Sequence, residues 1–126
     1  RVSRRQRQMC IRDSYWTLPA GFLENGESIE EGALRETMEE AKLQVSDVKL
    51  FTILSVPHIN QIYTFFTGKV VNYDFGPTPE SSEVELFKFD DIQWSELAFP
   101  TVIKTLKLFL EHGDDKVINE TLKPRV

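Results

Sequence analysis

The sequence has little cysteine and no long apolar run. Of its 126 residues only Cys10 is a cysteine, which excludes an internal disulfide bond and suits a cytoplasmic protein. No hydrophobic stretch is long enough to cross a membrane, and neither a secretory signal nor an internal repeat is present. These absences exclude a membrane protein, a disulfide scaffold and a repeat array. With 40% hydrophobic and 28% charged residues, the sequence predicts one soluble globular domain.

The basic residues are concentrated at the start of the chain. Residues 1–14 contain five arginines and one acidic residue, while the whole chain has a net charge of −5. A basic arm for nucleic acid is one interpretation. However, residues 4–13 can be encoded by CGTCGGCAGCGTCAGATGTGTATAAGAGAC, which resembles an adapter of transposon-based sequencing libraries. We therefore interpret residues 1–14 as a non-native segment, exclude them from the fold prediction, and expect no nucleic-acid partner.

Four later segments have the composition of β-strands. Runs of β-branched and aromatic residues predict strands at residues 15–18, 48–56, 61–71 and 84–89. The second and third are expected to form a hairpin around residues 58–60. Gly76, Pro77 and Pro79 predict a loop over residues 72–82, and residues 114–126 form a tail without a structural signal.

Two segments have helical periodicity. Ser28 and Glu31 form a capping box that predicts a helix over residues 29–42. Pro100 begins a second amphipathic helix that ends near Gly113. The apolar face of the first helix is expected to pack on a sheet, and its members are Leu34, Thr37, Met38 and Ala41. Helices on both sides of a sheet predict an α/β sandwich.

The first helix also carries an acidic stripe. With Glu36 at zero on a helical wheel, Glu40 lies at roughly +40° and Glu39 at roughly −60°, away from the apolar face. Like charges at this spacing destabilise a helix by a few tenths of a kcal/mol per pair. A solvated acidic face is one interpretation. The other is a Mg²⁺ site, because hard divalent cations bind carboxylate and carbonyl oxygens, and Arg35 can brace the carboxylates through ion pairs.

The spacing of these residues resembles a known motif. Gly21 is followed after five residues by Glu27, and after seven more by the run Arg-Glu-Thr-Met-Glu-Glu-Ala at residues 35–41. This pattern resembles the Nudix box, with Lys42 at the position of an expected glycine. Residues 16–22, 57–61, 83–87 and 97–99 are similar to a branch of bacterial ADP-ribose pyrophosphatases and the plant chloroplast FAD pyrophosphatase.

The resemblance implies a fold and an activity. It implies a Nudix α/β/α sandwich with a mixed sheet over residues 15–113, whose N-terminal strands are expected to be missing. The implied reaction is hydrolysis of the diphosphate in FAD, ADP-ribose or NADH, dependent on Mg²⁺ with Mn²⁺ as the alternative metal. A nucleotide-sensing module without catalysis is the alternative, and loss of strands would leave this chain impaired. A homodimer is a family expectation for the intact protein.

The resemblance also implies roles for individual residues. The predicted metal ligands are the carbonyl of Gly21 (or of Ala20) and the carboxylates of Glu36, Glu39 and Glu40. Glu27 is expected to hold Arg35 or a metal-bound water. The predicted catalytic residues are thus Glu36, Glu40, Arg35, Glu27 and, as a candidate general base, Glu83.

The predicted substrate contacts lie outside the acidic stripe. These are His58, Gln61, Phe22 and Glu80, with Glu80 a second candidate for the base. Each has a simpler interpretation, since a lone histidine is more often structural, loop acids are often solvated, and loop aromatics often pack.

Overall fold

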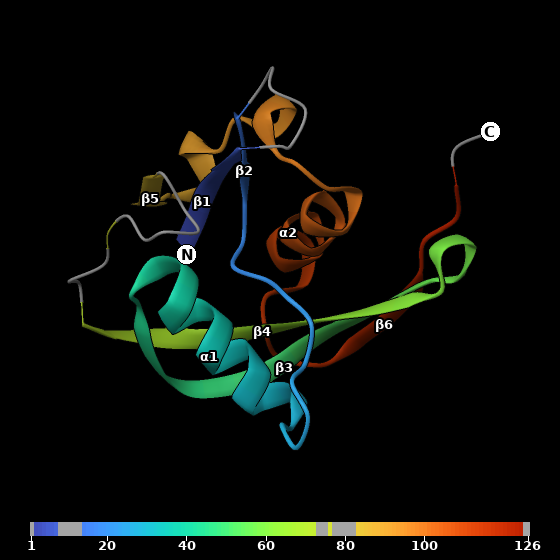
Figure 1. The fold of residues 1–126 in the computed structure, drawn as a ribbon. Helices are drawn as coiled ribbons and strands as arrows, with labels where there is room; N and C mark the ends of the chain where they lie inside the picture. Colours follow the sequence, from blue (N-terminus) through green and yellow to red (C-terminus); the bar gives the residue numbers. More distant parts are fainter. Residues whose placement is uncertain (1, 8–13, 73–75, 77–82, 125–126) are drawn as a thin grey trace.

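The computed structural model describes residues 2–7, 14–72, 76 and 83–124. Within these residues none of the helices is long and apolar enough to cross a membrane. The main elements, labelled in Figure 1, are β1 Val2–Arg7, β2 Ser14–Thr17, α1 Ile29–Ala41, β3 Gln44–Val56, β4 Gln61–Asn72, β5 Glu83–Leu86, α2 Pro100–His112 and β6 Ile118–Thr121.

The strands form two three-stranded sheets. One has the order β2-β1-β5 and is antiparallel throughout. The other has the order β4-β3-β6, with β3 antiparallel to β4 and parallel to β6, so it is mixed. The expected α/β fold with a mixed sheet is therefore confirmed. Strand β1 lies within residues 1–14, which the sequence analysis interprets as non-native. Strand pairing uses backbone groups that every sequence has, so the pairing of β1 does not test this interpretation, which stays a prediction.

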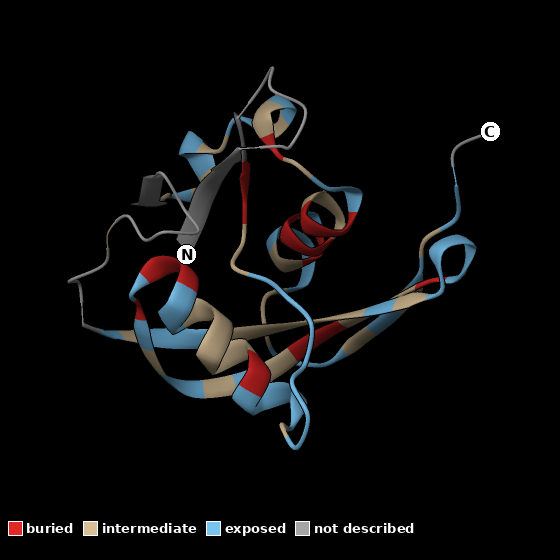
Figure 2. Ribbon diagram, viewed as in Figure 1, coloured by how far each residue is buried: buried red, intermediate tan, exposed pale blue. Residues whose placement is uncertain are grey.

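Helix α2 contributes buried residues to two of the core clusters. Figure 1 shows it between the two sheets, and Figure 2 shows buried positions gathered on it. Val102 and Leu106 pack with Trp16 of β2, whereas Leu108 packs with Phe51 and Leu54 of β3. The helix thus packs against both sheets.

The strand boundaries differ in part from the sequence prediction. The hairpin of β3 and β4 is confirmed, but β3 begins at Gln44, before the predicted start at residue 48. The strand contains a register shift at Asp47, where φ is 53°, and pairing with β4 continues on both sides of it. The short polar strand β6 lies in the tail for which no structure was predicted.

The predicted apolar face of α1 is partly wrong. Ala41 is fully buried, but Met38 is 43% exposed. Glu40, placed by the wheel on the outward stripe, is only 4% exposed. The reason is that residues 18–27 pass alongside α1 (Figure 1), where the Ala20 N–H donates to Glu40 and Gly21 lies against Glu36, so this side is covered as well.

Candidate active site

The start of α1 is held by a capping box. The Ser28 hydroxyl accepts a hydrogen bond from the Glu31 N–H at 3.1 Å, and the Glu31 carboxylate accepts one from the Ser28 N–H at 2.9 Å. The capping box predicted from the sequence is therefore confirmed. Hydrogen bonding of the Glu31 carboxylate to Ser28, first of all to its backbone N–H, keeps the pKa of Glu31 below its ordinary value.

Arg35 is the centre of a polar network beside the loop at residues 18–27. Its Nε donates to one oxygen of Glu27 at 2.6 Å and its Nη2 to the other at 3.0 Å. This two-point contact is the strong form of an arginine–carboxylate pair. Hydrogen bonding to Arg35 is the main reason that the pKa of Glu27 is lowered, and the same contact, followed by that to Glu36, raises the pKa of Arg35. Glu27 thus contacts Arg35, as one of the two roles implied by the resemblance requires.

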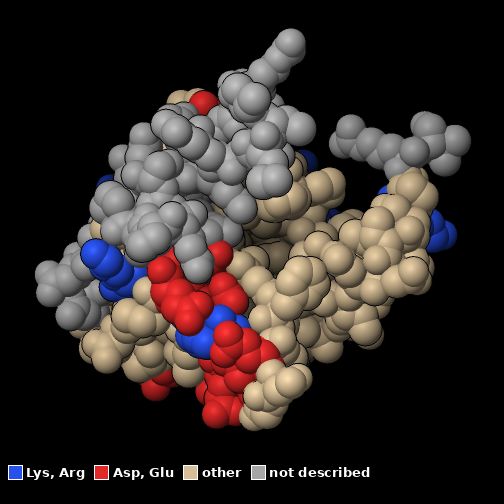
Figure 3. Space-filling view, viewed as in Figure 1, with Lys and Arg blue, Asp and Glu red and all other residues tan. Residues whose placement is uncertain are grey.

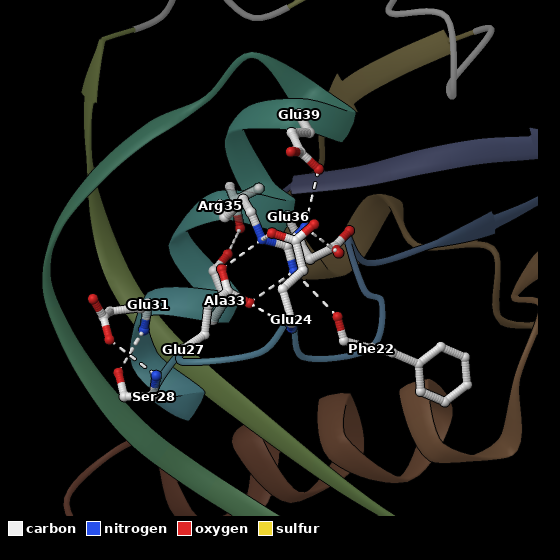
Figure 4. A network of polar contacts seen from close by, with 10 residues as sticks. Phe22, Glu24, Glu27, Ser28, Glu31, Ala33, Arg35, Glu36 and Glu39 are labelled. Carbon is white, nitrogen blue, oxygen red and sulfur yellow. Dashed lines mark hydrogen bonds and ion pairs between the residues drawn. The ribbon is translucent and has the colours of Figure 1, made fainter.

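The remaining donors of Arg35 connect the loop to the helix. Nη1 contacts Glu36 at 2.7 Å and Glu39 at 3.1 Å, and Nη2 donates to the Phe22 carbonyl at 3.1 Å. Figure 4 shows these groups turned toward the guanidinium, whereas the Phe22 ring points away from it. One planar cation therefore fixes the carboxylates of α1 and the loop backbone in a common arrangement.

The sequence analysis missed Glu24 as a member of this network. Its carboxylate lies 3.3 Å from Nε of Arg35, and its N–H donates to Glu27 at 2.9 Å. The Glu27 N–H in turn donates to the Glu24 carbonyl at 3.1 Å. The three-residue spacing around the Asn25-Gly26 turn was the signal that could have identified it.

Two further contacts bring the loop against α1. The Ala20 N–H donates to Glu40 at 2.7 Å. A Cβ atom added at Gly21 would lie 2.4 Å from a carboxylate oxygen of Glu36, so only glycine allows this approach. The backbone at Ala20 and Gly21 is therefore held beside the carboxylates that the Nudix resemblance assigns to the metal.

The donor chemistry of this region fits a hard divalent cation. Glu36 and Glu39 reach the same cationic nitrogen of Arg35, so two carboxylates converge on one position. Figure 3 shows acidic surface gathered around a basic group on this face of the molecule. Among the described residues, no group of three His, Cys, Asp or Glu side chains is assembled as a metal site, and the Glu40 carboxylate accepts from the Ala20 N–H. The full predicted ligand set, including Gly21, stays a prediction.

The predicted substrate residues do not all lie near the carboxylates. His58 is in the short helical turn Pro57–Ile59 at the end of the β3–β4 hairpin, and Gln61 follows it. Figure 1 shows this turn far from α1. The Tyr63 hydroxyl donates to the Gln61 side chain, which gives Gln61 a contact within the hairpin. Within one copy of the chain, the hairpin does not bring these residues to the acidic cluster.

Phe22 lies next to the network, with its side chain 81% exposed. Glu83 is the first residue of β5, and its side chain lies outside the described part of the structure. Glu80 lies outside the described residues altogether. The assignment of a general base therefore stays a prediction.

Comparisons with known proteins agree on one family. The NUDIX domain family matches residues 2–109. A NUDIX hydrolase from Nitrosomonas europaea has a crystal structure that is 37% identical, with a TM-score of 0.88 over 98% of this chain and 71% of that one. An ADP-ribose pyrophosphatase from Streptococcus suis shares the fold at 21% identity, with a TM-score of 0.71 over 96% of this chain and 88% of that one.

A curated relative extends the comparison to a longer protein. The NAD-capped RNA hydrolase NudC of Edwardsiella ictaluri is 31% identical over 80 residues, which are 63% of this chain and 31% of that protein. The matched region therefore spans about a third of the relative's length.

Proposed function

This chain belongs to the NUDIX domain family, and we propose that it hydrolyses the diphosphate of a nucleoside diphosphate derivative. FAD and ADP-ribose are the leading substrates, with NADH a further candidate. Water attacks one phosphorus, the bond from that phosphorus to the bridging oxygen breaks, and AMP and a second phosphate product are released. The observation that carries the proposal is the Arg35 network, which holds Glu36 and Glu39 together beside the loop backbone.

The chain's own residues position the reacting groups in this proposal. Arg35 is held by Glu27 at two points, so its guanidinium is fixed and in turn orients the carboxylate of Glu36. Gly21 leaves the space beside Glu36 free of a side chain. Phe22, exposed next to this space, contacts the bound substrate.

The acidic residues have two roles in this proposal. Glu36, Glu39, Glu40 and the Gly21 carbonyl would hold Mg²⁺ or Mn²⁺, which when bound neutralises phosphate charge and lowers the pKa of water. Glu83 is the proposed base that takes the proton of the attacking water, with Glu80 the second choice. Glu83 is the first residue of β5, and Glu80 precedes it by three positions in the sequence.

The test is a hydrolysis assay of the full chain with Mg²⁺. The panel contains FAD, ADP-ribose, NADH, nucleoside triphosphates and, because of the similarity to NAD-capped RNA hydrolases, NAD-capped RNA. We expect AMP from FAD or ADP-ribose, and a loss of roughly 100-fold or more in kcat for Glu36→Gln.

The matched control is Glu30→Gln, which makes the same chemical change at an exposed position in the first turn of α1. This variant should keep wild-type activity. If the wild-type chain binds nucleotides but cleaves none of them, the hydrolase proposal is wrong and the nucleotide-sensing alternative replaces it.

A further inference from the structure

A cavity of about 280 Å³, partly open to solvent, lies between the two helices and the β3–β4 hairpin. Ala33 and Thr37 line it from α1, Leu106 and Phe109 from α2, and β3 and β4 complete its walls. Protein interiors contain few voids larger than a water molecule. A partly open cavity of this size leaves room for a bound group.

The walls of the cavity suit a flat aromatic ring. Phe51, Phe65, Phe66 and Phe109 contribute to the lining, and aromatic side chains stack on or pack edge-to-face against other rings. Pockets that take a whole drug-sized ligand measure roughly 300–1,000 Å³. A cavity slightly below that range admits one ring system rather than a complete dinucleotide.

Asp114 adds a specific polar group to this apolar space. Of the described residues that line the cavity, it alone carries a charge. It lies 3.4 Å from the Thr67 hydroxyl, which donates to it, and 3.7 Å from Nζ of Lys49. An ionised carboxylate has about four acceptor sites, so Asp114 can accept a further hydrogen bond from an amino group in the cavity.

The cavity and the acidic cluster share one segment of chain. Leu18 and Pro19 line the cavity, while the next two residues, Ala20 and Gly21, contact Glu40 and Glu36. Figure 3 shows a hollow beside the acidic surface. A molecule that spans this segment would have its ring on one side and its diphosphate on the other.

We propose that this cavity receives the adenine ring of the substrate, with Asp114 accepting a hydrogen bond from the exocyclic amino group. The proposal rests on the proposed function, because FAD, ADP-ribose and NADH all join an adenosine to the diphosphate. Adenine combines a flat ring with an amino donor, so it matches both the aromatic walls and the single carboxylate. Hypoxanthine has a carbonyl in place of the amino group and lacks this match.

The first experiment compares ADP-ribose with its hypoxanthine analogue, inosine diphosphate ribose. We expect the wild-type chain to prefer ADP-ribose by roughly tenfold in kcat/KM, since a site that hydrogen-bonds a substrate group rejects an analogue without it. Asp114→Asn should bring this ratio to one or below, because the amide NH₂ donates to the hypoxanthine carbonyl. Lys49→Met is the control, since it removes the same ion pair while leaving Asp114 in place, and it should keep the wild-type ratio.

The second experiment measures binding of adenosine and inosine by equilibrium dialysis, without any turnover. Ala33→Leu fills part of the cavity and should weaken adenosine binding at least tenfold without lowering the melting temperature. Met38→Leu, on the exposed side of α1, is the control. Equal binding of adenosine by wild type and Ala33→Leu, or an unchanged substrate ratio in Asp114→Asn, would overturn the adenine site. If the wild-type chain cleaves neither diphosphate, the proposed function fails, and the dialysis still decides whether the cavity binds adenine.

Discussion

Arg35 uses its guanidinium to connect two parts of the chain that no strand or helix connects. It contacts Glu27 and the Phe22 carbonyl in the loop, and Glu36 and Glu39 on its own helix. A guanidinium presents five donors in a fixed plane, whereas an ammonium is a point charge. The geometry of the planar group, more than its charge, is what keeps these oxygens in place.

Arg35→Lys tests this distinction. The lysine keeps the positive charge but cannot contact both oxygens of Glu27 while reaching Glu36, so we expect kcat to fall by roughly 10- to 100-fold, the effect of a small misplacement of reacting groups. Steady-state hydrolysis of the best substrate, with a melting curve to confirm folding, measures it. Full activity in this variant would show that charge alone suffices.

Glu31 predicts how the stability of α1 depends on pH. The Ser28 N–H and hydroxyl hold the pKa of Glu31 below its ordinary value of 4.5. A lowered folded pKa adds stability above the unfolded pKa, and this contribution is lost as the pH falls through the folded value. Glu31→Gln keeps a side-chain oxygen that can accept from the Ser28 N–H, but it does not titrate. The difference in the free energy of unfolding between wild type and this variant should therefore become smaller below about pH 4.5.

The measurement is urea unfolding at neutral and at acidic pH. Glu30→Gln, at the adjacent exposed position, serves as the control and should show no comparable narrowing. A gap that stays constant from pH 7 to pH 3 would contradict the role assigned to the Glu31 carboxylate.

The spacing of residues in the sequence predicted the contacts within α1 and at its cap. It did not predict which sides of the helix are buried. The capping box and the Arg35–Glu39 pair are local and follow from positions three or four residues apart. Glu40 is buried because its carboxylate accepts from Ala20, twenty residues earlier. A helical wheel assumes one covered side, so it could not show a loop that covers a second side.

At the scale of elements, α1 ends at a position whose backbone conformation favours glycine. Lys42, at the position where the Nudix box has glycine, adopts the left-handed conformation with a φ of 54°. Its N–H donates to the Met38 carbonyl at 2.9 Å, so the helix terminates as a glycine would terminate it. Lysine in place of glycine therefore adds backbone strain at this position, but the conformation of the helix cap is the same.

Lys42→Gly should therefore stabilise the protein. Glycine removes the cost of a side chain in the left-handed region and adds some entropy to the unfolded state, for an expected net gain of about 0.5–1 kcal/mol in the free energy of unfolding. Lys42→Ala is the matched control, since it shortens the side chain without relieving the strain. An equal effect of the two variants would argue against strain at this residue.

The strands show where composition was sufficient and where it was not. Hydrophobic and β-branched runs identified the hairpin of β3 and β4. The first part of β3 was missed because its register shifts near Asp47, which interrupts the alternation of residues. Strand β6 has the sequence Ile-Asn-Glu-Thr, and four residues of this composition acquire a strand only by pairing with β3.

At the scale of the whole molecule, α2 determines how the two sheets are held together. Its buried side chains contact β2 through Trp16 and β3 through Phe51 and Leu54. The buried Thr52 and Thr105 hydroxyls, 3.3 Å apart, add a polar contact between β3 and α2. Loss of packing on this helix should therefore destabilise the domain as one unit.

Leu108→Ala is expected to lower the free energy of unfolding by roughly 2–5 kcal/mol, the cost of a cavity at a buried leucine. Leu108 is 4% exposed, whereas Leu110 on the same helix is 54% exposed. The identical substitution at Leu110 should cost less than about 1 kcal/mol. Chemical denaturation followed by circular dichroism compares the two variants. Similar losses in the free energy of unfolding would contradict the role assigned to the packing of Leu108 between α2 and β3.

The candidate site illustrates the same limit of sequence information. Residues 21–43 contain the carboxylates, the arginine and the loop glycine, so their proximity followed from a single local motif. His58 and Gln61 were assigned by similarity to the same branch, but the hairpin places their turn away from α1. The cavity is lined from α1, α2, β3 and β4 together, and no local pattern could have indicated it.

The parallel pairing of β6 with β3 has a consequence for the order in which the protein forms. During synthesis, β3 and β4 emerge together and can pair at once, but the second edge of β3 has no partner until residues 118–121 have been made. In the interval that edge offers unpaired backbone groups to any other extended chain. The nascent protein is therefore most open to association with its neighbours on the ribosome in the period before β6 emerges, and the pairing of β6 with β3 then closes this edge.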